Sequence, residues 1–91
     1  MIYRLTRRAQ ADIEQIYRYT IENFGAVQAE LYLGGLDYTF DLLTDNPNMG
    51  IQFSGQVRRY TYKHHYVFYR VERRAIIILR ISHTKRKLPV D

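Results

Sequence analysis

The stretch from Val57 to His83, VRRYTYKHHYVFYRVERRAIIILRISH, decides the fold expected for this chain. It contains three short runs rich in Val, Ile, Tyr and Phe, at Val57–Tyr62, Tyr66–Val71 and Ala75–Ser82. The polar interruptions Lys63-His64-His65 and Glu72-Arg73-Arg74 separate these runs, which predicts a three-stranded antiparallel meander. The third run is apolar on both faces over residues 75–79, so we expect it at a covered, interior position of the sheet.

Upstream of this stretch, apolar residues recur every three or four positions, as on one face of a helix. The first stripe is Ala9, Ile13, Ile16, Tyr17, Thr20 and Phe24. The second stripe is Ala29, Leu33, Leu36, Phe40 and Leu43. Thr6 is suited to cap the first helix, Gly25 to end it, and Asn46-Pro47 to end the second. Because the two stripes are so close, the sequence predicts an antiparallel helical hairpin.

Two further features refine the helices. Polar residues such as Asp12, Glu14 and Glu22 fall between the apolar positions and are expected to face solvent. Gly34-Gly35 lies inside the second helix, where each glycine costs about 1 kcal/mol relative to alanine. We interpret the pair as a place where another element approaches the helix closely.

The fold class that follows is α+β. Residues 1–91 form one domain, since a chain of this length supports a single core. Ile2–Leu5 is expected to add a strand, and residues 45–56 to form a loop. The predicted order is β-α-α-β-β-β, with the helical hairpin packed on one face of an antiparallel sheet because no other element can cover it.

Charge is divided unevenly along the chain. The net charge is +5, yet residues 1–45 carry four basic and seven acidic residues, and residues 46–91 carry ten basic and two acidic ones. The halves therefore carry −3 and +8. A negatively charged partner would meet the sheet and the C-terminal tail rather than the helices.

Several classes of chemistry have no support in the sequence. It contains no cysteine and lacks the GxxxxGK[ST], GxGxxG and HExxH motifs, so no thiol nucleophile, cofactor or metal site is expected. The spacing of His64, His65 and His83 does not by itself indicate a metal centre. With no apolar run long enough for a membrane span and no secretory signal at its start, the chain is expected to be cytoplasmic, with no membrane partner.

Two basic segments remain as candidate sites. Residues 58–65 place Arg58 and Arg59 on opposite faces of one strand, so one arginine must lie away from the helices. Residues 80–87 carry Arg80, Lys85, Arg86 and Lys87 at the end of the last strand. Guanidinium groups beside tyrosine rings suit phosphate contact and base stacking, although basic residues also serve simply to protect a sheet edge. Whether the two segments meet depends on the strand register, which the sequence leaves open.

Motifs along nearly the whole chain resemble the ParE toxins of bacterial toxin-antitoxin systems, within the RelE/ParE superfamily. They are Tyr3-Arg4-Leu5-Thr6-x-x-Ala9-x-x-Asp12-Ile13-x-x-Ile16-Tyr17-x-Tyr19-Thr20, Phe24-Gly25-x-x-Gln28-Ala29-x-x-Tyr32, Asn46-Pro47, Tyr66–Val71 and Ile78-Leu79-Arg80-Ile81-x-His83. No single motif is diagnostic, but their order and spacing together support the assignment. The family fold is a helical hairpin packed on an antiparallel sheet.

The resemblance implies a toxin that inhibits or poisons DNA gyrase by binding it and is neutralised by a ParD-like antitoxin. The residues expected to bind the target and carry toxicity are Arg58, Arg59, His83, Lys85 and Arg86. No catalytic residue is expected on this interpretation, and direct contact with nucleic acid is secondary. The antitoxin-binding residues are left open.

RelE-type relatives give the alternative, a ribosome-dependent mRNA endonuclease. Its candidate residues are Arg59, Lys63, His64 and His83. The ending from His83 to Arg86 departs from those ribonucleases and is of the ParE-like style. A third, non-toxic interpretation is a basic module that only binds nucleic acid.

Overall fold

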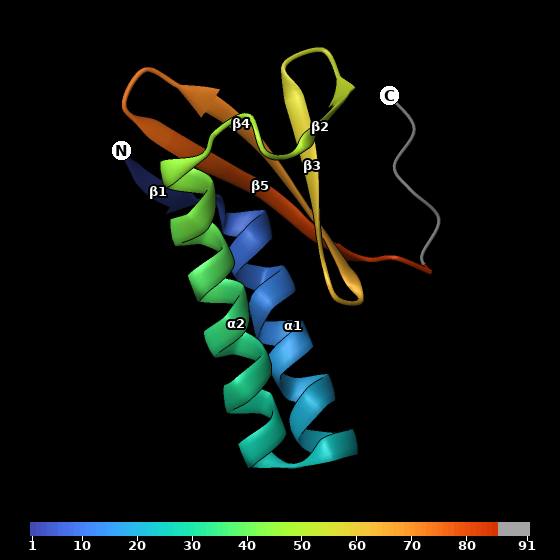
Figure 1. The fold of residues 1–91 in the computed structure, drawn as a ribbon. Helices are drawn as coiled ribbons and strands as arrows, with labels where there is room; N and C mark the ends of the chain where they lie inside the picture. Colours follow the sequence, from blue (N-terminus) through green and yellow to red (C-terminus); the bar gives the residue numbers. More distant parts are fainter. Residues whose placement is uncertain (86–91) are drawn as a thin grey trace.

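The computed structural model describes residues 1–85, which form two helices and five strands (Figure 1). In chain order these are β1 Ile2–Leu5, α1 Arg7–Phe24, α2 Ala26–Asp45, β2 Ile51–Ser54, β3 Val57–Tyr62, β4 His65–Glu72 and β5 Ala75–His83. The predicted helical hairpin and meander are confirmed, with β4 one residue longer at each end and β5 one residue longer at its end. Neither helix is long and apolar enough to cross a membrane.

The strands form one sheet in the order β1-β5-β4-β3-β2. The apolar strand β5 lies between β1 and β4, which confirms its interior position. All neighbours are antiparallel except β1 and β5, which pair in parallel from Ile2 opposite Ala75 to Leu5 opposite Ile78. The expectation of an entirely antiparallel sheet is therefore wrong at this pair. Parallel neighbours require a long connection, and here the chain between them includes both helices and three strands.

Strand β2 is the element that the sequence did not predict. It lies within the expected loop and pairs antiparallel with β3, Ile51 opposite Arg59, with a bulge between Gln52 and Ser54. Four residues that include Gln and Ser are too few to show the alternation of a half-buried strand. The pairing with β3 therefore comes from the tight turn at Gly55, whose φ of 55° suits glycine.

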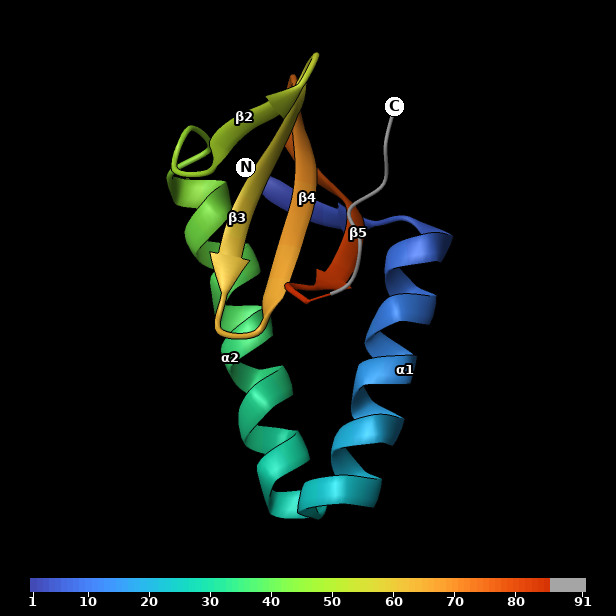
Figure 2. The ribbon, with the colours of Figure 1, turned by 90° about the vertical axis from the view of Figure 1, so that its right-hand side faces the viewer.

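The hairpin of α1 and α2 covers one face of the sheet. Its inner sides meet the sheet in a core that contains Ala9, Ile16, Tyr32, Leu36, Phe40, Leu43, Val67, Tyr69, Ile76, Ile78 and Ile81. Figures 1 and 2 both show the connected ends of the two helices extending beyond the strands. This part of the hairpin has no sheet to cover it.

Three residues of α1 differ in burial from what the helical pattern predicts. Phe24 and Tyr17 continue the apolar stripe, but their exposed fractions are 65% and 40%. The stripe outruns the sheet at Phe24, so helical spacing alone overestimates burial there. Asp12 was expected to face solvent and is buried, with 7% of its surface exposed, because the first half of α1 packs beside β5.

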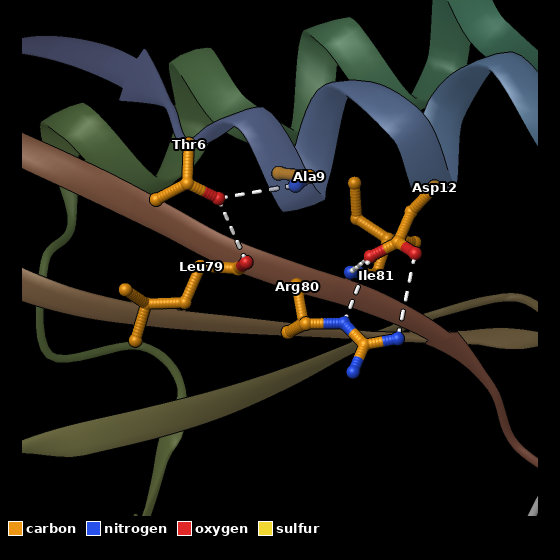
Figure 3. A network of polar contacts seen from close by, with 6 residues as sticks. All are labelled: Thr6, Ala9, Asp12, Leu79, Arg80 and Ile81. Carbon is orange, nitrogen blue, oxygen red and sulfur yellow. Dashed lines mark hydrogen bonds and ion pairs between the residues drawn. The ribbon is translucent and has the colours of Figure 1, made fainter.

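Polar contacts from α1 and its cap cover the part of β5 that β1 does not reach (Figure 3). The Thr6 backbone N–H donates to the Ile78 carbonyl at 3.1 Å, and its hydroxyl donates to the Leu79 carbonyl at 2.9 Å. The same hydroxyl accepts the Ala9 N–H, which confirms Thr6 as the N-cap. Farther along, an Asp12 carboxylate oxygen accepts the Ile81 N–H at 2.9 Å. These contacts fix α1 against the strand that forms one wall of the candidate site.

The glycine pair in α2 has two different surroundings. A Cβ on Gly35 would lie 2.1 Å from the Tyr62 hydroxyl oxygen, whereas a Cβ on Gly34 would meet nothing within 4 Å. The close approach predicted for the pair is therefore confirmed at Gly35 and wrong at Gly34. The tyrosine that requires the space donates its hydroxyl to the Tyr32 carbonyl at 3.0 Å.

Candidate functional site

The β3–β4 turn and the end of β5 lie side by side at one end of the sheet. His65 of β4 pairs with Tyr62 on one side and His83 on the other. The Thr84 N–H also donates to the His64 carbonyl at 2.8 Å. Because β3 and β5 run in the same direction on either side of β4, the start of β3 lies at the opposite end of the sheet. The register thus separates Arg58 from the end of β5 and brings the histidines together.

The His83 ring contacts the rings of both other histidines. The His83 ring centroid lies 5.2 Å from that of His65 and 6.3 Å from that of His64. The planes of the His83 and His64 rings differ by only 10°. The His83 Nδ1 accepts the Lys85 N–H at 3.1 Å. Among residues 1–85 no three His, Asp or Glu side chains are placed to hold a metal ion. With Lys63 and Lys85 beside them, these imidazoles offer N–H donors suited to an anion.

Tyr32 of α2 anchors this end of the sheet to the hairpin. Its hydroxyl lies 2.6 Å from His65 Nδ1 and accepts the His64 backbone N–H at 3.3 Å. Burial raises the pKa of the Tyr32 hydroxyl above its ordinary value. The Lys63 Nζ lies 5.8 Å from the Tyr32 ring centroid and 5.6 Å from that of Tyr62, within the range of cation–π attraction.

A groove of about 910 Å³ runs between the hairpin and these strand ends. We call it the hairpin groove, and its lining residues are Asp12, Gln15, Ile16, Tyr19, Thr20, Phe24, Gln28, Tyr32, Lys63, His64, His65, Ile81, His83 and Lys85. Aromatic and aliphatic side chains from the helices form one part, and basic side chains from the strand ends form the other. Among the described residues that line it, Asp12 is the one carboxylate, and it is already held by Arg80 Nε at 3.1 Å and by the Ile81 N–H. The groove is therefore apolar with a positively charged rim.

The residues proposed from the sequence are divided between different places. His83 and Lys85 line the hairpin groove, as do Lys63 and His64 of the ribonuclease set. Arg58 lies near the other end of the sheet, where its Nη1 donates to the Gly50 carbonyl at 2.7 Å and so holds the loop before β2. Arg86 lies outside the described residues.

Arg59 is the arginine that faces away from the helices. It pairs with Phe68, whereas the neighbours Val67 and Tyr69 point into the core beneath the hairpin. Its guanidinium carbon lies 4.3 Å from the Tyr66 ring centroid and 5.9 Å from that of Phe53. The Phe53 and Phe68 rings are themselves in edge contact at 5.0 Å. We call Phe53, Arg59, Tyr66 and Phe68 the outer-face cluster, and Arg59 is not among the residues that line the groove.

Sequence reasoning missed the aromatic part of the groove. Tyr32 lies outside the predicted stripe of α2, and Tyr19 lies outside that of α1. The sequence signal for both tyrosines is their place in the quoted ParE-like motifs, Tyr17-x-Tyr19-Thr20 and Gln28-Ala29-x-x-Tyr32. The proximity of Tyr32 to His65 depends on long-range packing and leaves no local trace.

Comparisons with known proteins agree with one another. Residues 3–88 match the family described as ParE toxin of type II toxin-antitoxin system, parDE. Toxin ParE1 of Caulobacter vibrioides is 37% identical over 84 residues, which covers 89% of this chain and 86% of that protein. Toxin ParE1 of Mycobacterium tuberculosis is 32% identical over 93 residues, which covers 98% of this chain and 93% of that protein. A structure titled as the chromosomal ParDE system from P. aeruginosa superposes with a TM-score of 0.82 at 26% identity, over 93% of this chain and 97% of that one.

Proposed function

Because this chain belongs to the ParE toxins of parDE type II toxin-antitoxin systems, we propose that it blocks replication by inhibiting DNA gyrase until an antitoxin binds it. The observation that carries the antitoxin half of this proposal is the hairpin groove, which is large, apolar and rimmed by basic groups. The target half rests on family membership and on the +8 charge of the second half of the chain. Action on gyrase also implies that the protein works in the cytoplasm.

The groove suits an amphipathic, acidic segment of a ParD-like antitoxin. Apolar side chains of such a segment would cover Tyr19 and Phe24, whose exposed fractions are 60% and 65%. Its carboxylates would meet the ammonium and imidazole groups of Lys63, His83 and Lys85. Binding would also stabilise the small toxin domain by mass action, since the unfolded chain has no groove.

Toxicity itself is proposed to be binding rather than catalysis. An acidic surface on the target would attract this basic protein, which can block the target's cycle by occupying that surface. Of the residues proposed for this contact, Arg59, His83 and Lys85 have side chains that reach a surface or the groove, whereas the Arg58 guanidinium is held by backbone carbonyls.

A supercoiling assay with purified gyrase tests the proposal. The wild-type chain should inhibit supercoiling or accumulate cleaved DNA, and Lys85→Ala combined with Arg86→Ala should weaken that effect more than a helix-surface change such as Glu14→Ala. Gyrase that is unaffected at any ratio of folded protein would refute the target. Equal activity of the double variant would assign Lys85 and Arg86 to solubility.

One observation favours the mRNA endonuclease as a second candidate. The structure brings Lys63, His64 and His83 to one end of the sheet, where imidazole groups could transfer protons. Arg59 lies on the other face of the sheet, so the set is incomplete as a single site. Codon-phased cuts in translated message that disappear in His64→Ala would support this function. Intact message at concentrations that arrest growth would exclude it.

A further inference from the structure

We propose that the outer-face cluster is a second protein-docking site, in which Arg59 receives a carboxylate from an acidic surface of the toxin's target. The inference rests on the proposed function for the identity of that target. It adds the face of the molecule that the target occupies and the residue that anchors it.

The Arg59 guanidinium is held in place but incompletely satisfied. Tyr66 stacks on it at 4.3 Å and Phe53 flanks it at 5.9 Å, which fixes the orientation of the planar group. Its Nε is buried and has no hydrogen-bond partner among residues 1–85. A buried donor on a charged group normally has an acceptor, because leaving it unpaired is costly. With its inner edge closed and its plane fixed, the guanidinium is left with its terminal Nη groups to meet a planar anion that reaches this face.

The surroundings of Arg59 favour one protein carboxylate over a chain of phosphates. Arg70 lies on the same sheet face and is already paired with Glu72 at 2.8 Å. Arg80, opposite Phe68, is paired with Asp12 at 3.1 Å. Nucleic-acid binding uses several free cations along the backbone, and these two are neutralised. Arg4 lies on the same face but on the edge strand β1, with β5 and β4 between it and β3. An unsatisfied arginine packed among aromatic rings is the composition of a hot spot at a protein interface.

The outer-face cluster and the hairpin groove lie on different surfaces. The strand register places Arg59 and Phe68 on the face away from the helices, whereas the antitoxin is proposed to bind on the helix side. Substitution of Arg59 should therefore separate toxicity from antitoxin binding. Residues that line the groove, such as His83, should not separate them.

The test compares Arg59→Ala and Arg59→Lys with Arg73→Ala, an exposed arginine in the β4–β5 turn whose loss changes the net charge equally. Arg59→Ala should bind purified gyrase at least about tenfold more weakly and fail to arrest growth, with antitoxin affinity unchanged. Arg59→Lys keeps the charge but loses the planar fork, so its affinity for gyrase should lie between those of the wild type and of Arg59→Ala. Arg73→Ala should behave as wild type.

Three results would overturn the proposal. One is Arg59→Ala with wild-type gyrase affinity and growth arrest. Another is loss of antitoxin binding in both Arg59 variants, which would make Arg59 a structural residue. The third is salt-sensitive binding of single-stranded RNA or DNA that depends on Arg59, which would assign the cluster to nucleic acid.

Failure of the proposed function is recognised separately, because the wild-type chain would then not bind gyrase. In that case the site is tested directly by titrating the labelled full chain with a glutamate-rich synthetic peptide. A saturable shift of the Arg59 Nε–H resonance, absent when the peptide carries glutamine instead, would support the docking site. An unmoved Arg59 resonance would overturn it.

Discussion

At the scale of single residues, Asp12 shows how one buried carboxylate joins α1 to the sheet. It pairs with Arg80, whose side chain is only 28% exposed, and accepts the Ile81 N–H at the part of β5 that β1 leaves uncovered. Removing it would leave both donors without an acceptor. The helical pattern alone predicts that Asp12 faces solvent, because only contacts distant in sequence reveal its role.

We predict that Asp12→Ala lowers the free energy of unfolding by about 2 to 3 kcal/mol. Asp12→Asn should lose less, because its side-chain oxygen can still accept the Ile81 N–H. Urea denaturation of both variants measures the difference. Equal stability of Asp12→Ala and wild type would show that the contact contributes nothing.

Gly34 and Gly35 form a matched pair for the next prediction. Alanine at Gly34 meets open space and should stabilise α2 by about 0.5 to 1 kcal/mol. Alanine at Gly35 gains the same helix propensity but displaces the Tyr62 hydroxyl from the Tyr32 carbonyl, so it should be less stable than Gly34→Ala by about 1 to 2 kcal/mol. Thermal unfolding ranks the two, and the reverse order would contradict the packing described.

Tyrosine ionisation should govern stability at alkaline pH. A hydrogen bond to Asp37, with burial and the nearby carboxylates, raises the pKa of Tyr3 from 10.0 to about 12. The folded state holds this proton more tightly than the unfolded chain, so its contribution is complete below pH 10 and is lost as the pH rises toward 12. Tyr3→Phe should therefore lose stability less steeply than wild type across that interval. Urea midpoints measured as a function of pH check this, and equal slopes would count against it.

At the scale of elements, the hairpin is longer than the sheet it covers. The excess length carries the aromatic part of the hairpin groove, and the strand ends carry the basic part. Phe24 and Tyr38 are equally exposed, at 65% and 66%, but only Phe24 lines the groove. Substituting each residue in turn therefore distinguishes loss of binding in the groove from a general loss of surface hydrophobicity.

We predict that Phe24→Ala weakens antitoxin binding by at least about tenfold, because it removes an aromatic anchor from the interface. Its stability should change by no more than about 0.5 kcal/mol, since the side chain makes little contact in the free toxin. Tyr38→Ala should leave both quantities unchanged. Calorimetric titration with the antitoxin tests the pair, and equal affinities of the two variants would place the antitoxin elsewhere.

Periodicity predicted most of the elements, because α1, α2 and β3–β5 each bury one continuous face or run. It failed where pairing with a neighbour decides the structure, as in β2, which is held by β3 and the Gly55 turn. The candidate site was predictable only in its charge. That Lys63 and His83 share a groove while Arg59 lies on the other face follows from strand register, which no local pattern encodes.

At the scale of the whole molecule, the uneven charge acquires a location. The +8 half builds strands β2 to β5, the basic rim of the hairpin groove and the outer-face cluster, and the −3 half builds β1 and the helices. Under the proposal, each partner has its own surface on this small domain: the antitoxin binds the hairpin groove, and the target binds the outer-face cluster. His83 and Lys85, which we propose to contact both partners, are where the antitoxin in the groove would exclude the target.

Titration of the antitoxin into a gyrase supercoiling reaction inhibited by this chain tests the central claim most directly. We predict that inhibition by the wild-type toxin is abolished as the antitoxin saturates the toxin, and that the Phe24→Ala toxin needs more antitoxin for the same relief. Supercoiling that the toxin never inhibits, or inhibition that a saturating antitoxin does not relieve, would contradict the account.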